Sequence, residues 1–456
     1  MKIFNTLSGK KEVFEPIEDN KIRMYICGMT VYDDTHIGHA RTFLSFDLIV
    51  RYLRSIDYEV QYIRNITDVD DKIIARAEEL NISPSELTKD CINSMQNDFK
   101  ALGMISPDAE PRATENIDSI ISLITKLIDK GHAYVSESDV YFSTESFAEY
   151  GKLSKRKLED MLSGARIDID LDKKNPADFV LWKKDTEGLK WDSPWGPGRP
   201  GWHIECSAMS MDALGETFDI HGGGSDLKFP HHENEIAQSE CVTGKEFAKV
   251  WMHTGSLRID EQKMSKSLKN FITIKEALKD SSSEVLRFFL ISSHYRSPLN
   301  YSDEGLKEAK NSLDRLYNSL QDLSYETDEH VPSEYSEKFH DAMQDDFNSP
   351  SAISVLFEMV KQINILKKED QLTHANTLAS ELISLSNILG ILLDNPEEYF
   401  TSGIDLSNQD IEAAIERRNK ARKEKDFELS DKIRDDLLEN GIILEDKGTK
   451  TIWKKS

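Results

Sequence analysis

The first part of the chain predicts a strand, a helix and a second strand, and this order constrains the fold more than any other feature. Hydrophobic residues alternate at Ile22, Met24 and Ile26, a Gly-Met-Thr turn follows, and residues 40–53 carry hydrophobic side chains at helical spacing. A second strand is predicted over residues 58–66, after a short connection. Strand, helix and strand in succession begin a parallel α/β sheet.

The sheet pattern is interrupted and then resumes. Short β-like runs and turn residues fill residues 131–200, which predicts an inserted subdomain. A helix over residues 206–214 and a strand over 217–221 follow, then a glycine-rich loop and a helix that starts at Pro230. We therefore predict an α/β fold, a Rossmann-type parallel sheet with one insertion.

Beyond Asn300 the pattern is helical, and from Asp405 a charged helix hairpin leads into a small β-hairpin. The prediction is a helical bundle followed by a small C-terminal α/β domain. The predicted segments are 1–130 and 201–255 for the two halves of the core, 131–200 for the insertion, 256–305 for a connecting region, 306–400 for the bundle and 401–456 for the C-terminal domain.

The segment His36-Ile37-Gly38-His39 lies where the first strand leads into the first helix. A helix N-terminus favours anions, and Gly38 permits a close approach to the backbone. The two imidazoles lie on one helical face, where they can bond phosphate oxygens. A single histidine at this place could equally be structural, but the position at the strand-to-helix turn favours a phosphate site.

A second motif, Lys263-Met264-Ser265-Lys266-Ser267, follows the second half of the sheet. Two lysines with hydroxyls beside them can neutralise the charge that builds on a triphosphate as pyrophosphate leaves. A lysine-rich loop by itself is ordinary protein surface. The histidine motif upstream is what makes the phosphate interpretation stronger.

Cys27, Cys206, His231 and Glu235 form a candidate zinc set. Pro230 is a natural first residue of a helix, so His231 and Glu235, one turn later, share a face. Thiolate, imidazole and carboxylate are all zinc ligands, although these four are too widely spaced for a local zinc finger. On the residues alone, buried structural roles for both cysteines stay open.

The charge of the chain restricts where nucleic acid can bind. The net charge is −25, from 57 Lys and Arg against 82 Asp and Glu, which argues against general attraction to nucleic acid. From Ile411 to Ser456, however, 12 basic residues stand against 11 acidic ones. An RNA contact is therefore expected to be local, with an ordinary solvated helix as the alternative for this tail.

The four cysteines lie too far apart to predict a disulfide framework. Cys91 and Cys241 belong to no motif and are predicted to pack. The sequence has neither a secretory signal pattern nor a membrane-spanning stretch, so the cytoplasm is the expected compartment.

Several stretches resemble cysteinyl-tRNA synthetase of the bacterial type, a class I aminoacyl-tRNA synthetase. They are CGMTVYDDTHIGHARTF, NITDVDDKI, GWHIECSAM, HGGGSDLKFPHHENEIAQSE and KMSKS, and the resemblance extends from Lys21 to the C-terminus. It implies ATP-dependent activation of L-cysteine to cysteinyl-adenylate and transfer to the 3′ terminal adenosine of tRNA(Cys), with the 2′ hydroxyl acylated first. Met29, where relatives often carry another residue such as proline, departs from the pattern.

The same resemblance implies one zinc ion per chain on Cys27, Cys206, His231 and Glu235, and a substrate thiolate that also binds the metal. Zinc prefers a soft thiolate to the hydroxyl of serine, so serine can be rejected without editing. Four protein ligands normally close a zinc site, so the coordination would have to expand to five. Mg²⁺ is expected with ATP.

The resemblance also implies roles for other residues. It gives catalytic roles to His36, His39, Lys263 and Lys266, and ATP binding to Gly38, Gly223, Gly224, Asp226 and Lys266. It places Thr67, Trp202 and His221 in the amino-acid pocket, and Arg422, Asp431 and Asp446 on the tRNA anticodon, with Trp453 nearby. Residues 256–305 would contact the tRNA stem, residues 401–456 would recognise the anticodon, and a monomer is expected.

Two other functions stay open at this point. One is a cysteine ligase that uses the same core on an amino sugar; such relatives lack an anticodon domain, and the tail from Asp405 to Ser456 argues against it. The other is a non-catalytic RNA-binding paralogue, against which the intact histidine, lysine and candidate zinc motifs argue.

Overall fold

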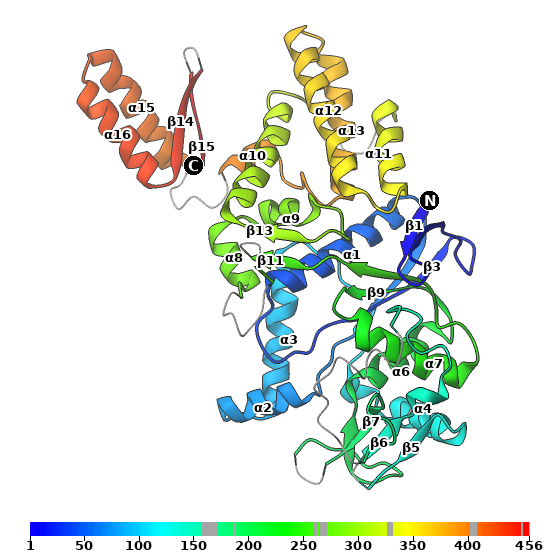
Figure 1. Ribbon diagram of the computed structural model, residues 1–456. Helices are drawn as coiled ribbons and strands as arrows, with labels where there is room; N and C mark the ends of the chain where they lie inside the picture. Colours follow the sequence, from blue (N-terminus) through cyan, green and yellow to red (C-terminus); the bar gives the residue numbers. More distant parts are fainter. Residues whose placement is uncertain are drawn as a thin grey trace. The chain divides into compact units, whose positions relative to one another are not determined.

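The computed structural model describes residues 1–137, 139–156, 172–185, 188–259, 262–263, 271–325, 332–401, 408–447 and 450–455 (Figure 1). Lys266 lies outside these ranges, and of Lys263 only the main chain is described. The chain forms two compact units, of which the first contains residues 1–313, 331–359 and 384–391, and the second contains 314–330, 360–383 and 392–456. The six predicted functional segments are a different division of the chain and stay a prediction.

A four-stranded parallel sheet lies in the first unit, in the order β10-β9-β3-β4. Its strands are β3 (Lys21–Ile26), β4 (Glu59–Arg64), β9 (Phe218–Gly224) and β10 (Ala248–Thr254). Ile22, Met24 and Ile26 are all fully buried, as expected for a parallel sheet that is covered on both faces. The predicted Rossmann-type sheet, built from two separated halves of the chain, is confirmed.

Helix α1 (Ile37–Ser55) connects β3 to β4 and begins earlier than the predicted Ala40. His36 caps it, because its side chain accepts a hydrogen bond from the backbone N–H of His39. The hydrophobic pattern did not include this first turn, since Gly38 and His39 contribute no apolar side chain to it.

The chain from Asp71 to Ala101 forms two helices, α2 (Asp71–Leu80) and α3 (Pro84–Ala101). Asn81 ends α2 in the left-handed region with φ 54°, and Ser83 caps α3, whose first residue is Pro84. The cap residues, which hydrophobic periodicity ignores, determine this break.

The insertion forms an antiparallel sheet in the order β5-β6-β7-β8. Its strands are β5 (Ala133–Val135), β6 (Asp139–Phe142), β7 (Phe179–Lys184) and β8 (Gly198–Pro200), which follow α4 (Ile117–Asp129) and precede α6 (Trp202–Leu214). Leu181 and Trp182 of β7 share one hydrophobic core with Ile124 of α4 and Ile204 of α6. The insertion therefore packs against α4 and α6.

One predicted boundary near the second half of the sheet is wrong. Strand β9 extends through the glycines to Gly224, because Gly222, Gly223 and Gly224 pair with Met252, His253 and Thr254 of β10. Glycine is required at position 222 because a Cβ there would lie 2.4 Å from the ring of Phe46. Helix α7 (Glu233–Thr243) continues directly from η3 (Lys228–His232), where Phe229 is extended with φ −145° and ψ 131°, so helical backbone starts at the predicted Pro230.

The other elements of the chain follow the predicted order, with helices after Asn300 and a small α/β module at the end. They are β1 (Lys2–Asn5), β2 (Lys10–Val13), β11 (Leu257–Ile259), β12 (Gln262–Lys263), α8 (Ile274–Asp280), α9 (Ser283–Ile291), β13 (Leu299–Tyr301), α10 (Asp303–Leu320), α11 (Glu334–Gln344), α12 (Ser349–Lys368), α13 (Leu372–Ile388), α14 (Pro396–Thr401), α15 (Asn408–Glu424), α16 (Phe427–Glu439), β14 (Ile442–Lys447) and β15 (Lys450–Lys455).

The C-terminal module has a hydrophobic core of its own. Ile411 and Ile415 of α15 pack against Ile433 and Leu437 of α16 and Ile442 of β14. The predicted helix hairpin and β-hairpin are confirmed. Within the described ranges, no helix combines the length and the hydrophobicity that crossing a membrane needs.

A buried arginine on α9 joins distant parts of the first unit and gives a stability prediction. Arg287 donates to the Asp47 carboxylate and to the backbone oxygens of Leu102 and Leu389. Arg287→Met should lower the free energy of unfolding of this unit by about 3–5 kcal/mol, because it leaves buried acceptors without their donor. Arg51 contacts the same carboxylate from a more exposed position, so Arg51→Met is the control and should cost about 1 kcal/mol or less. Urea unfolding of both variants, monitored by circular dichroism, measures this difference. Equal shifts of the unfolding midpoint in Arg287→Met and Arg51→Met would contradict the ranking.

Candidate active site

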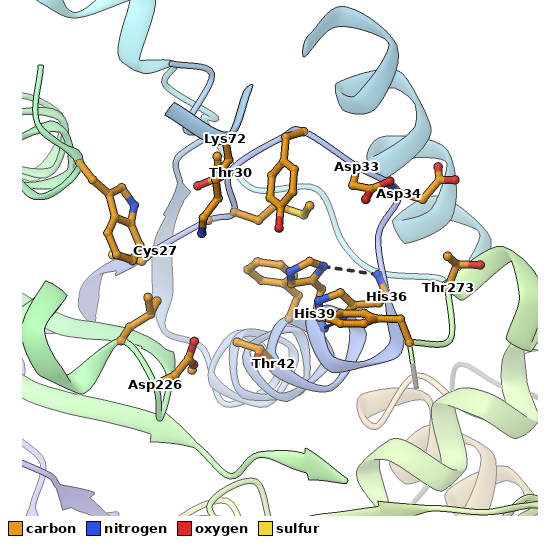
Figure 2. A pocket seen from close by; sticks show the side chains of 18 residues that line it. Cys27, Thr30, Asp33, Asp34, His36, His39, Thr42, Lys72, Asp226 and Thr273 are labelled. Atoms are coloured by element: carbon orange, nitrogen blue, oxygen red, sulfur yellow. Dashed lines mark hydrogen bonds between the residues drawn. The ribbon is translucent and has the colours of Figure 1, made fainter. Parts of the chain in front are cut away.

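A cavity of about 590 Å³ opens at the carboxyl ends of the parallel strands (Figure 2). It is bordered by residues that follow β3, begin α1 and follow β9, which is where open α/β sheets bind ligands. The predicted site residues that line it are Cys27, His36, His39, Trp202, Gly224 and Asp226.

His36 and His39 of the histidine motif lie side by side in this cavity. The rings of His36 and His39 stack with centroids 3.5 Å apart, and Nδ1 of each ring takes part in the helix cap. Backbone hydrogen bonds join this turn to the segment that follows the lysine motif, from Ile37 N to the oxygen of Ile272 and from Ile274 N to the oxygen of Thr35. These bonds hold residues 272–274 against the histidine turn, while residues 264–267 of the lysine motif lie outside the described ranges.

The four predicted metal donors are brought together and fully buried beside the cavity. Cys27 Sγ lies 3.6 Å from Cys206 Sγ and 3.3 Å from Glu235 Oε1. His231 Nε2 lies 3.0 Å from the same Glu235 oxygen. One donor atom from each of the four residues lies within 4.8 Å of the others, a spacing that fits a single ion.

The electrostatics of this cluster favour the ionised form of two of the four donors, Cys206 and Glu235. Burial alone would raise the pKa of Cys206, but the hydrogen bond to Cys27 and the neighbouring His231 lower it to about 6. For Glu235, burial is outweighed by His221 and His231, which hold the pKa of its carboxyl well below its usual range. Burial, together with the hydrogen bond to Cys206, raises the pKa of Cys27. Metal binding would therefore release the proton that Cys27 keeps.

A second layer of histidines supports the cluster from behind. His221 Nε2 lies 2.7 Å from Glu235 Oε2, and the His221 ring stacks on Trp251. His221, His232, Cys27 and Glu235 form a second group of potential ligands that shares two members with the first. His232 Nδ1 bonds His253, whereas its buried Nε2 has no hydrogen-bond partner, so the site has an unsatisfied polar atom beside the donors. These observations fit a metal ion with ordered outer partners.

Trp202 lies over the donor cluster at the cavity wall. Its indole stacks on His231 with ring centroids 4.3 Å apart, and it is 37% exposed. His203, the next residue, bonds His231 Nδ1 through its own Nδ1 at 2.9 Å. Trp202 and the donor Cys27 both line the cavity, so a ligand bound at the donors from this side would lie beside the indole.

Comparison with known proteins gives the family. The model described as "tRNA synthetases class I (C) catalytic domain" matches residues 13–311, and that of the DALR domain matches residues 338–394. Cysteine–tRNA ligases of Hahella chejuensis and Haemophilus influenzae are 54% and 53% identical to the chain, and each match covers 100% of both proteins. The chain belongs to the cysteine–tRNA ligase family of class I tRNA synthetases.

Solved structures of other class I synthetases share the fold. Methionyl-tRNA synthetase of Mycobacterium tuberculosis aligns with a TM-score of 0.61 at 14% identity, over 81% of this chain and 89% of that one. A leucyl-tRNA synthetase of Agrobacterium radiobacter aligns with a TM-score of 0.57 at 11% identity, over 82% and 84% of the two chains. At these identities the likeness concerns the fold alone.

Among the described residues predicted to bind ATP or the amino acid in this member of the cysteine–tRNA ligase family, four do not line the cavity: Gly38, Thr67, Gly223 and His221. Thr67 is buried and pairs through its backbone with Met29 and Val31, so it supports the cavity wall from behind. His221 faces Glu235 instead of the cavity. A Cβ on Gly223 would approach Leu227 and His232, so this glycine permits close packing.

Sequence reasoning assigned no role to several residues that do line the cavity, among them Tyr32, Asp33, Asp34, Lys72, Thr42, Phe271 and Thr273. Asp33 and Asp34 lie in sequence between Cys27 and His36, within the quoted stretch CGMTVYDDTHIGHARTF. This position could have indicated that they line the same cavity. Lys72 lies in the quoted NITDVDDKI stretch, and Figure 2 shows it pointing into the cavity. Phe271 and Thr273 had no sequence signal, because only the backbone bonds to the His36 turn bring them there.

In the C-terminal module, two of the three predicted anticodon residues contact each other. Arg422 Nη1 of α15 lies 2.6 Å from Asp446 Oδ2 of β14. Asp431 is exposed on α16, and Trp453 of β15 packs on the core of the module.

Cobalt(II) binding tests the donor cluster. Cys206→Ser should weaken cobalt binding at least tenfold, because a thiolate donor is replaced by a poor hydroxyl donor, and should reduce the thiolate-to-metal absorption band. Cys241→Ser is the matched control, since Cys241 packs in the core near the insertion and should leave the spectrum unchanged. Equal cobalt spectra and affinities for wild type and Cys206→Ser would contradict the assignment.

Proposed function

We propose that this chain activates L-cysteine with ATP in the cavity and then transfers the cysteinyl group to the 3′ terminal adenosine of tRNA(Cys). Family membership makes it an enzyme that activates the amino acid and charges tRNA, since the cysteine–tRNA ligases match over the whole chain. The observation that carries the choice of cysteine is the buried group of two sulfurs, one imidazole and one carboxylate beside the signature histidines.

In the first step, a carboxylate oxygen of cysteine attacks the α-phosphorus of ATP, and the bond to the pyrophosphate oxygen breaks. His36 and His39 line the cavity where this charge develops, and Lys263 and Lys266 belong to the segment that leads to the bonded turn at Ile272. Catalysis in this proposal is chiefly positioning and electrostatic stabilisation. Gly224 and Asp226 border the nucleotide side, and Mg²⁺ accompanies the phosphates.

Zinc is the proposed metal, held by Cys27, Cys206, His231 and Glu235. When bound, zinc supplies a soft Lewis acid that favours the sulfur of cysteine over the oxygen of serine. His221 orients the Glu235 carboxylate through their 2.7 Å contact, and His203 orients His231. Trp202, stacked on His231, covers the donors on the cavity side and borders the amino acid.

In the second step, the terminal ribose hydroxyl of the tRNA attacks the carbonyl carbon of the adenylate, and AMP leaves. Class I membership favours the 2′ hydroxyl as the nucleophile. Residues 256–305 are proposed to contact the tRNA stem and residues 401–456 the anticodon, through Arg422, Asp431 and Asp446. Carboxylates that accept from base N–H groups suit a module of mixed charge.

The two alternative functions gain no support from the comparisons. The family match includes the C-terminal module, which an amino-sugar ligase would not need. The histidine motif and Cys27 line one cavity, which a non-catalytic paralogue would not need. We further propose a cytoplasmic monomer, as expected from the resemblance, and a reducing compartment keeps the two sulfur donors available.

Amino-acid-dependent ATP–pyrophosphate exchange tests the choice of substrate. Exchange with cysteine should exceed exchange with serine by roughly 10⁴-fold in kcat/KM, because serine leaves the soft metal without a matching donor. Removal of the metal with a chelator should abolish exchange with cysteine, and zinc should restore it. A fully active, metal-free protein would disprove the cysteine mechanism while leaving the nucleotide site intact.

Lys266→Ala tests the lysine motif. This variant should bind cysteine with unchanged affinity in calorimetry and lose about 10²–10³-fold in pyrophosphate exchange, because the lysine acts on charge that builds in the transition state. Lys279→Ala, at an exposed position on α8, is the control and should keep full exchange. Normal exchange in Lys266→Ala would refute its catalytic role.

A further inference from the structure

The carboxylate of Asp446 has an unusual number of hydrogen-bond donors for a residue that is 38% exposed. Arg418 donates to both oxygens, from Nη1 to Oδ1 and from Nη2 to Oδ2, each at 3.0 Å. Thr451 Oγ1 donates to Oδ1 at 2.7 Å, and Arg422 Nη1 donates to Oδ2 at 2.6 Å. A carboxylate accepts about four hydrogen bonds, so these four donors fill it.

The four bonds differ in how firmly they are held. The side chain of Arg418 is only 7% exposed, and it lies on the buried face of α15 that also carries Ile411 and Ile415. A guanidinium buried in this way needs a carboxylate partner, and the two-bond geometry fixes the plane of that carboxylate. Arg422, in contrast, is 47% exposed and makes a single bond to Asp446.

A base that bonds Asp446 must replace one of these donors. Arg418 cannot leave without becoming an unpaired buried charge, which is costly. Arg422 can leave for solvent at little cost, since an exposed ion pair contributes little. Its exposed guanidinium can then contact a phosphate or a base oxygen of the same RNA.

We propose that Arg418 is a positioning residue of the RNA-reading surface: it holds the Asp446 carboxylate in a fixed plane, while Arg422 is the donor that a base displaces. This inference rests on the proposed anticodon role of Asp446 and adds to it a residue that touches no RNA. It also explains how a module of nearly neutral charge reads a base: the carboxylate is kept ionised and oriented by an arginine that is buried in the protein.

A tRNA(Cys) charging assay with the full-length Arg418→Lys variant tests the proposal. Lysine keeps the charge but cannot make two parallel bonds, so kcat/KM for tRNA should fall about 10- to 100-fold. Discrimination against a tRNA with substituted anticodon bases should fall with it, while cysteine-dependent pyrophosphate exchange stays normal. The matched control is Arg417→Lys, because Arg417 is the exposed neighbour on the same helix. Loss of charging with discrimination unchanged would indicate a merely structural role and overturn the proposal.

Asp446→Asn separates failure of this inference from failure of the proposed function. If Asp446→Asn leaves both charging and discrimination normal, the anticodon role of Asp446 fails, and the proposal about Arg418 fails with it. If Asp446→Asn loses discrimination and Arg418→Lys does not, the anticodon role stands and only the positioning role is overturned.

A crystal structure of the wild-type enzyme with tRNA(Cys) needs no variant and so covers the case in which Arg418→Lys does not fold. We expect Arg418 still to meet both oxygens of Asp446, and a base N–H to occupy the position that Arg422 holds in the free protein. An Asp446 carboxylate with all four protein donors unchanged, or one that Arg418 has left, would overturn the proposal.

Discussion

The parallel pairing of β3 with β9 is the contact on which the active site depends. Ile26 pairs with Gly222, and the backbone N–H of Cys27 donates to the oxygen of Gly222 at 3.0 Å. This register places the carboxyl end of β3 beside the glycines at the carboxyl end of β9. Cys27 thereby reaches the donors of α6 and α7, and the same edge carries the histidine turn and the cavity.

The buried carboxylate of Glu235, near this edge, has a partner for each of its two oxygens. Glu235 is shared between His221 on one oxygen and His231 on the other, which explains its lowered pKa despite complete burial. Asp47 and Arg287 pair in the same manner at a distance from the site. Because an unpaired charge in the interior is costly, such pairs restrict the packing to one arrangement.

The acidic composition is compatible with a tRNA substrate under the local recognition proposed for the C-terminal module. The C-terminal module concentrates arginines beside one carboxylate, and its core is independent of the parallel sheet. A fixed ion pair of this kind depends on geometry and short contacts, whereas the overall charge of −25 acts over long range and is screened by salt.

The sequence by itself determined the class of fold and predicted which residues form the site. Alternation at Ile22, Met24 and Ile26 and the position of the histidine motif predicted the sheet and its active edge, because these signals are local. The motifs and their resemblance to a family predicted the four donors. Only the tertiary structure decided that Gly222 to Gly224 form a strand, that His221 faces Glu235, and that Phe271 reaches His36. The reason is physical: these three contacts depend on pairings between segments far apart along the chain. Residue type and periodicity are local properties and do not indicate which distant segment a residue will contact.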